Sequence, residues 1–173
     1  HPKHQNKQWP SIPGWMGHSD IYAFAGRYEP NPGIISQSTG SPVIIPNEIF
    51  SAAVEIWGKV SVREIDKKHE SLTRLFHQLI PQECGSLGAE MISPAEHSES
   101  GGHVSIRHPG AGPVSEALLE HGVVSSFRKP DSIRFGISPL YHSHLDIFEG
   151  IQRLKKVLSG EIWKEERFQK VSV

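Results

Sequence analysis

The chain has 173 residues, 36% of them hydrophobic, and its 18 basic and 19 acidic side chains give a formal net charge of −1. This length suits one domain or one and a half with a modest core, and the balanced charge disfavours nucleic acid or an anionic membrane as a partner. A single cysteine excludes an internal disulfide framework, and no apolar run is long enough to span a bilayer. These features predict a cytoplasmic protein.

The N-terminal quarter of the sequence is irregular. Residues 1–45 are rich in glycine, proline, serine and aromatic side chains and show little periodicity. After Pro46, apolar residues recur at helical spacing up to Trp57, which predicts a first helix. A second helix is predicted from Ser61 to about Gln78, and its charged face is expected to be solvated.

Beyond Pro81 the pattern alternates between strands and helices. Strands are predicted at 89–92, 103–107, 122–127 and 132–137, and helices at 113–120 and 143–158. This order predicts an α+β domain in which a short, mostly antiparallel sheet is covered by helices on one face. A charged tail, residues 161–173, is expected to fray.

One arginine is the strongest functional feature of the chain. The run RKPDSIRFGISPLY, from Arg128 to Tyr141, places Arg134 in a short apolar segment between two loops marked by prolines. An inward-pointing guanidinium on a strand is costly to desolvate unless it meets an anion, and its forked donors suit a carboxylate. The structural alternative is a strand residue that points to water with its stem packed on apolar neighbours. The residues alone leave both interpretations open.

Four segments carry a family resemblance: GWMGH at 14–18, Gly40-Ser41-Pro42, VSIRHP at 104–109, and the run that contains Arg134. Together they resemble kynureninase, a fold-type-I hydrolase that uses pyridoxal phosphate. The resemblance spans nearly the whole chain but reaches only the C-terminal part of the family pattern. It implies that residues 1–45 end the large cofactor domain and that residues 46–160 form the small C-terminal domain.

The resemblance also implies roles for individual residues. Arg134 matches the arginine that holds the substrate α-carboxylate. Trp15 matches a tryptophan that lies against the cofactor phosphate, and Ser41 matches a threonine or asparagine that contacts the cofactor. Met16 and His18 are expected on the substrate side. The structural alternatives are a hydrophobic plug for Trp15, simple packing for Met16 and a loop cap for His18.

No lysine of this chain matches the family's cofactor lysine, so no catalytic residue is predicted here and the chain alone is expected to be inactive. The resemblance implies a larger enzyme that cleaves L-kynurenine to anthranilate and L-alanine, with pyridoxal 5'-phosphate as cofactor. It further implies a homodimer with shared active sites. Preference between L-kynurenine and its 3-hydroxy form is left open.

The sequence leaves two alternative identities for the chain open. The chain could be a noncatalytic truncated fragment, or part of another fold-type-I enzyme such as an aminotransferase or a cysteine desulfurase. Although His142 and His144 could chelate a metal together, no HExxH or paired-cysteine motif exists, and we expect no metal site. Cys84 has no histidine pattern to activate it and is predicted to be a buried structural thiol.

Overall fold

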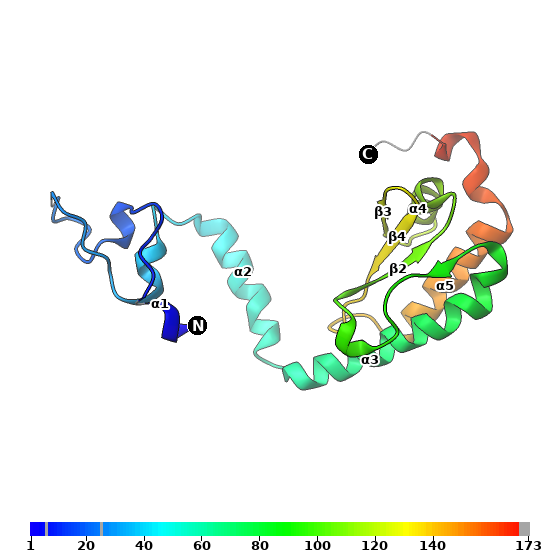
Figure 1. Ribbon diagram of the computed structural model, residues 1–173, viewed down its shortest axis with the longest axis horizontal. Helices are drawn as coiled ribbons and strands as arrows, with labels where there is room; N and C mark the ends of the chain where they lie inside the picture. The colour runs from blue at the N-terminus through cyan, green and yellow to red at the C-terminus, as the bar shows by residue number, and fades with distance from the viewer. Residues whose placement is uncertain (6, 25, 170–173) are drawn as a thin grey trace. The chain divides into compact units, whose positions relative to one another are not determined.

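The computed structural model describes residues 1–5, 7–24 and 26–169, and it divides into two compact units, His1–Lys59 and Val60–Val173 (Figure 1). The first unit contains α1 (Pro2–Gln5), the 3-10 helices η1 (Trp15–Gly17) and η2 (Gly33–Gln37), and α2 (Ile44–Trp57). Before α2 the described backbone is irregular, with one isolated β-bridge between His18 and Pro30. This agrees with the weak periodicity of the segment.

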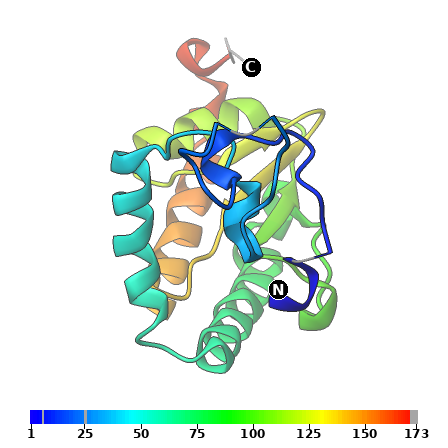
Figure 2. The ribbon, with the colours of Figure 1, turned by 90° about the vertical axis from the view of Figure 1, so that its left-hand side faces the viewer.

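Helix α2, the cyan helix of Figure 2, begins slightly earlier than its sequence pattern predicts. Pro46 lies in its first turn, where the backbone N–H that proline lacks would have no helical partner. No side chain of α2 is buried, and Phe50 is 69% exposed. Because α2 falls in the first unit, the division between the units follows Lys59. Our assignment of residues 1–45 and 46–160 to two enzyme domains stays a prediction.

The second unit is an α+β domain, as predicted. Its helices are α3 (Val62–Leu79), α4 (Ala111–Glu120) and α5 (His144–Ser159), and its strands are β1 (Glu90–Met91), β2 (His103–Arg107), β3 (Ser126–Arg128) and β4 (Ser132–Gly136). The strands pair antiparallel in the order β1-β2-β4-β3. Strand β3 is shorter than predicted, because residues 122–125 do not pair with β4.

The core of the second unit lies on one face of this sheet. Alternate side chains of the two central strands, Val104 and Ile106 on β2 and Ile133 and Phe135 on β4, are buried. Helices cover this face: α3 and α5 run side by side, and α4 packs against β3 and β4 (Figure 1). The ring of Phe76 on α3 lies 5.3 Å from that of Phe135. The residues between the buried ones therefore project from the opposite face.

Two helices begin at capping boxes. The Ser61 Oγ accepts a hydrogen bond from the N–H of Glu64 at the start of α3, and the Glu64 carboxylate accepts one from the Ser61 N–H. Ser143 and Asp146 form the same arrangement at the start of α5. The hydrogen bonds from Ser143, first from its backbone N–H, lower the pKa of Asp146. Reciprocal caps satisfy two otherwise unpaired donors, which explains why these starts follow the sequence closely.

The C-terminal segment corrects the prediction of a frayed tail. Residues 161–169 form the short helices η6 (Ile162–Lys164) and η7 (Glu166–Phe168), and the Phe168 side chain is 4% exposed in the core. The Trp163 ring covers Gly110 so closely that a Cβ there would lie 2.3 Å from the ring. Apolar burial thus outweighs the charged composition of the segment. Residues 170–173 of the predicted tail lie outside the described residues.

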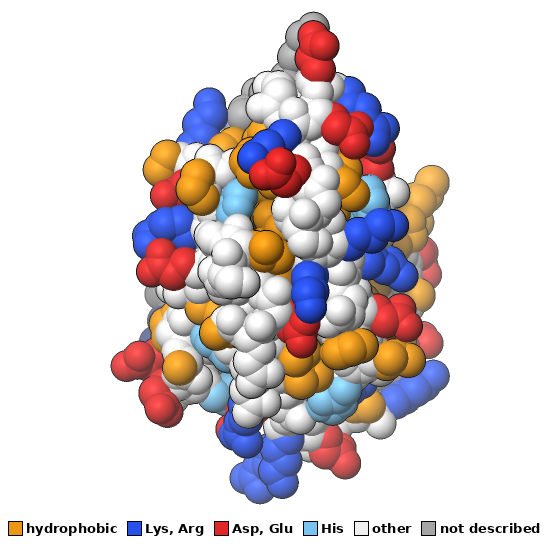
Figure 3. Space-filling view, turned by 90° about the vertical axis from the view of Figure 1, so that its right-hand side faces the viewer, with side chains coloured by type: hydrophobic (Ala, Val, Ile, Leu, Met, Phe, Trp, Pro, Cys, Tyr) orange, Lys and Arg blue, Asp and Glu red, His pale blue; other side chains and the backbone are white. Residues whose placement is uncertain are grey.

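Basic and acidic side chains are interspersed on the face shown in Figure 3. Several of them form ion pairs, such as Lys155 with Glu83 at 2.8 Å and Arg167 with Glu120 at 2.7 Å. Such exposed pairs contribute little to stability, because water screens the attraction between the charges. Within the described ranges, no helix is both long and apolar enough to cross a membrane.

We expect this fold to lose stability in mild acid through His108. Its Nδ1 accepts a hydrogen bond from the Gly110 N–H at 3.0 Å, and its ring meets the Trp163 ring edge-on at 5.2 Å. Burial lowers the pKa of His108, although a hydrogen bond to the Leu87 backbone opposes this. The unfolded chain therefore takes up the proton first. The contribution of His108 to the free energy of unfolding is complete above about pH 6.5, the pKa in the unfolded chain. It is lost as the pH falls from there through the lower pKa of the folded state.

Urea unfolding at several pH values between about 7.5 and 5 measures this loss. The matched variant His108→Asn keeps a side-chain acceptor for the Gly110 N–H but does not titrate. Its free energy of unfolding should therefore fall less on acidification. Burial also lowers the pKa of His69 and His77, so the variant should retain part of the pH dependence. Equal losses in both proteins would contradict the role of His108.

Candidate functional site

Arg134 lies on β4 between two buried residues, Ile133 and Phe135. Because side chains alternate along a strand, it projects from the sheet face opposite the helices. Of the two orientations that the sequence left open, Arg134 therefore does not point into the core of this unit. The side chain is nevertheless partly buried, since it lies in the middle of the sheet with β2 and β3 on either side.

A serine on each neighbouring strand lies level with Arg134. Its register partner on β2 is Ser105, and its partner on β3 is Ser126. The Arg134 Nε–H donates to the Ser126 Oγ at 3.3 Å. Within the described part of the chain, the terminal amino groups Nη1 and Nη2 of Arg134 have no protein partner. The guanidinium is thus hydrogen-bonded through Nε, while its two terminal amino groups, the open fork of Arg134, remain available to a ligand.

The other arginines of this sheet face differ from Arg134. Arg107 is neutralised by Glu90 at 3.1 Å and by Asp131 at 3.4 Å. Arg128 is exposed and donates to the carbonyl of Phe127 at 2.9 Å. Among the described residues, no carboxylate forms an ion pair with Arg134. A partly buried cation that lacks an anion is the arrangement expected of a carboxylate-binding site.

In the first unit, two glycines bring the GWMGH segment against residues 36–39. A Cβ on Gly14 would lie 1.8 Å from the Thr39 carbonyl oxygen, and one on Gly17 would lie 2.7 Å from the Ser36 carbonyl oxygen. Only glycine permits such close contact between two backbones. Trp15 therefore lies on a segment that adjoins the turn containing Ser41.

Trp15 and Ser41 present free hydrogen-bonding groups. The Trp15 side chain is 52% exposed, and Ser41 is exposed. Over residues 1–5, 7–24 and 26–169, neither the indole N–H nor the serine hydroxyl has a partner. Both groups can donate to phosphate oxygens. These two residues consequently fit the contacts of a phosphate-bearing cofactor, although neither segment carries a lysine or an arginine.

Met16 is partly buried, and His18 organises its own loop. The His18 Nδ1 accepts the Asp20 N–H at 3.0 Å, its Nε2 lies 3.4 Å from the Arg27 carbonyl oxygen, and its ring contacts Tyr28. Both ring nitrogens are thus occupied, as expected of a loop cap. Trp15 and His18 also line a hollow of about 400 Å³ together with Asp20, Ile21, Tyr22, Phe24 and Tyr28. The substrate-binding roles of Met16 and His18 stay predictions.

The structure gathers Trp15, Met16, His18 and Ser41 in the first unit and holds Arg134 in the second. Sequence reasoning missed Ser126, the residue that contacts Arg134. Ser105, Ser126 and Arg134 lie in three separate segments of the sequence, one on each of the strands β2, β3 and β4. Only the pairing register shows that they form one row across three strands.

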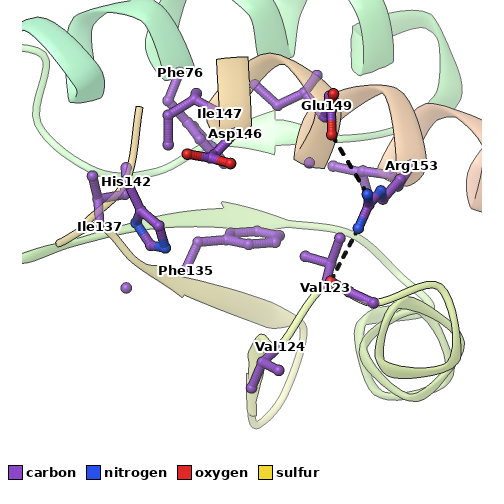
Figure 4. A pocket seen from close by; sticks show the side chains of 15 residues that line it. Phe76, Val123, Val124, Phe135, Ile137, His142, Asp146, Ile147, Glu149 and Arg153 are labelled. Carbon is purple, nitrogen blue, oxygen red and sulfur yellow. Dashed lines mark hydrogen bonds and ion pairs between the residues drawn. The ribbon is translucent and has the colours of Figure 1, made fainter. Parts of the chain in front are cut away.

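A second hollow, of about 330 Å³, opens beside β4 and α5 (Figure 4). Phe76, Phe135 and Ile147 form its apolar walls. Two of its polar side chains make local contacts: the His142 Nδ1 accepts the Ser138 N–H at 3.1 Å, and Asp146 belongs to the capping box. A further pair lies at the other end, where Arg153 binds Glu149 at 3.5 Å and the Gly122 carbonyl oxygen at 3.2 Å. These contacts are thus a local cap and an ion pair on α5, and none of the residues that line this hollow was a predicted site residue.

Two further histidines make side-chain contacts. The His144 Nε2 lies 2.8 Å from the Ser71 Oγ, and the His97 Nε2 lies 2.8 Å from the Asp66 Oδ1. No cluster of three or more histidine, cysteine or acidic residues in the described ranges is arranged to hold a metal ion. Cys84 is fully buried, and burial raises the pKa of its thiol to about 11. The prediction that this thiol is buried is confirmed.

Comparisons with known proteins add the family context. Residues 65–154 match a family model described as the kynureninase C-terminal domain. The chain is 32% identical over 158 residues to a kynureninase of Pseudomonas fluorescens and 35% identical over 156 residues to one of Deinococcus radiodurans. The alignments cover 91% and 90% of this chain but only 38% of each relative.

Among solved structures, the chain resembles an apo cysteine desulfurase from Thermococcus onnurineus NA1 with a TM-score of 0.67. The match covers 87% of this chain and 40% of that one, at 15% sequence identity. At this identity the likeness shows the fold alone. It agrees with the predicted fold, the small C-terminal domain of a fold-type-I pyridoxal-phosphate enzyme.

Proposed function

This chain belongs to the kynureninase family, and from that premise we propose that it is the C-terminal portion of a pyridoxal-phosphate-dependent hydrolase. The whole enzyme cleaves L-kynurenine to anthranilate and L-alanine in tryptophan catabolism. It acts as a cytoplasmic homodimer with shared active sites. The single observation that carries this proposal is the open fork of Arg134, a partly buried guanidinium without an anion among the described residues.

In this proposal Arg134 binds the α-carboxylate of the amino-acid substrate. The two terminal amino groups match the two carboxylate oxygens, and such charged, paired hydrogen bonds fix the orientation of a ligand as well as its affinity. The substrate is thereby held with its reacting carbons in a defined place. The central position of β4 supports this role, because a strand that is hydrogen-bonded on both sides holds the Arg134 backbone in a fixed position.

Trp15 and Ser41 hold the cofactor phosphate in this proposal. Their free donors and their adjoining segments support the assignment. When bound, pyridoxal phosphate supplies an electron sink for carbon–carbon bond cleavage. The exposed apolar side chains of α2, among them Ile49 and Phe50, support burial of that helix in the assembled protein.

Other fold-type-I activities are less well supported. The likeness to a cysteine desulfurase rests on 15% identity, whereas the kynureninases share 32–35% with the chain. An isolated, noncatalytic product would retain the fold of the second unit but would not turn over substrate. A kynureninase and a cysteine desulfurase differ in which substrate the full-length protein turns over, L-kynurenine or L-cysteine.

Turnover by the full-length protein that carries this chain tests the proposal. With pyridoxal phosphate present, L-kynurenine should yield fluorescent anthranilate and L-alanine in equal amounts, and L-cysteine should yield no sulfide. The chain by itself should yield neither product, because none of its lysines matches the cofactor lysine of the family. Release of sulfide from L-cysteine without anthranilate formation would instead establish a desulfurase.

A further inference from the structure

We propose that Ser126 is a positioning residue that sets how Arg134 receives a carboxylate. This inference rests on the proposed function, because it assumes that Arg134 binds the substrate. The Arg134 Nε–H donates to the Ser126 Oγ at 3.3 Å, across the pair of strands β3 and β4. Within the described chain the Ser126 hydroxyl has no other partner. Its one visible task is therefore to hold this guanidinium.

The position of that hydrogen bond selects one binding geometry. A guanidinium can receive a carboxylate side-on, through Nε and one amino group, or end-on, through both amino groups. Because the Arg134 Nε–H already donates to Ser126, a carboxylate cannot bind side-on through Nε. Only the end-on geometry remains available to it. Nη1 and Nη2 are left free of partners among the described residues. Ser126 thus directs the carboxylate to the tip of the side chain.

The same contact limits the motion of a long side chain. A free arginine populates many rotamers, and ordering them on binding costs affinity. Ser126 lies on a strand that is hydrogen-bonded to β4, so the serine is fixed relative to the Arg134 backbone. A guanidinium that is oriented before the substrate arrives loses less freedom when it binds.

Ser105 provides a matched comparison on the other side of Arg134. It occupies the same level of the sheet on β2 and is also partly buried. Its backbone N–H donates to the Ser93 Oγ at 2.8 Å, but its hydroxyl has no hydrogen bond to Arg134. The row is therefore asymmetric, with one serine that holds the arginine and one that does not.

The experiment compares Ser126→Thr with Ser126→Val in the full-length enzyme. Threonine and valine have nearly the same shape and both favour strands, so the pair differs mainly in the hydroxyl group. The valine variant should show a KM for L-kynurenine about three- to ten-fold higher than the threonine variant, the loss expected for one ordinary hydrogen bond. The kcat should change less than about two-fold. Ser105→Ala should leave both constants at the wild-type values.

A double-mutant cycle separates positioning from a general structural effect. In an Arg134→Lys background the ε-ammonium lacks Nε–H, so Ser126→Val should raise KM no further than Ser126→Thr does. An equal rise in both backgrounds would overturn the inference, and so would equal KM values for the two Ser126 variants of the otherwise wild-type enzyme. If Arg134→Lys itself left KM unchanged, the carboxylate site of the proposed function would fail as well. The two failures are thus distinguishable.

Discussion

Replacing Arg134 with lysine in the full-length enzyme is expected to raise the KM for L-kynurenine about 10- to 100-fold. Lysine keeps the positive charge but loses the planar fork that pairs with both carboxylate oxygens. A hydrogen bond to a charged group contributes about 1.5–3 kcal/mol, and each 1.4 kcal/mol corresponds to a tenfold change in affinity. Because the carboxylate is held in the ground state and in the transition state alike, kcat should fall much less than KM rises.

Arg128→Lys is the matched control for this measurement. Arg128 is on the neighbouring strand β3, on the same sheet face, and like Arg134 it has no ion pair among the described residues. It is exposed, however, and donates to the Phe127 carbonyl oxygen. Steady-state constants for this variant should match the wild type within about two-fold. Similar increases in KM for both variants would indicate a general effect of charge on this face instead of a specific site.

Replacing Phe168 with alanine is expected to lower the free energy of unfolding of the chain by about 3–5 kcal/mol, the usual cost of removing a buried phenyl ring. The side chain is 4% exposed and belongs to the core, and the Arg167 guanidinium lies 4.4 Å from the centre of its ring. Arg167 is in turn paired with Glu120 on α4. Urea unfolding followed by circular dichroism measures the change.

Phe148→Ala removes the same ring from a surface position of α5, where the side chain is 44% exposed. Its effect should be clearly smaller, since less apolar area leaves the core. A loss of less than about 1 kcal/mol for Phe168→Ala would mean that the C-terminal segment is peripheral to the fold. Residues 161–169 would then be expected to fray, as their charged composition predicts.

Local signals explain why most elements were predicted well. The starts of α3 and α5 follow their capping serines, Ser61 and Ser143, because a cap depends on residues within one turn. Strand β2 matches its prediction because its alternation of buried and exposed residues is complete within five positions. The motifs that resemble kynureninase are also local, which is why the family could be suggested from them and was confirmed by comparison.

Long-range contacts explain the differences. Strand β3 was predicted over 122–127, but Arg153 on α5 binds the Gly122 carbonyl oxygen, and residues 122–125 are unpaired with β4. Gly122 itself adopts a positive φ of 73°, which a strand does not accommodate. No pattern within the segment could reveal a partner on a helix that follows later in the chain.

By itself, then, the amino-acid order determined the helices, the alternation of the central strands, the family and the choice of Arg134, since each depends on neighbours a few positions apart. Tertiary structure decided three other properties: the sheet face on which Arg134 lies, opposite the core, its contact with Ser126, and the burial of Phe168. Each of these depends on which distant surfaces pack together and on the register between strands. Such pairings are settled by the total apolar area buried and are not encoded in any single segment.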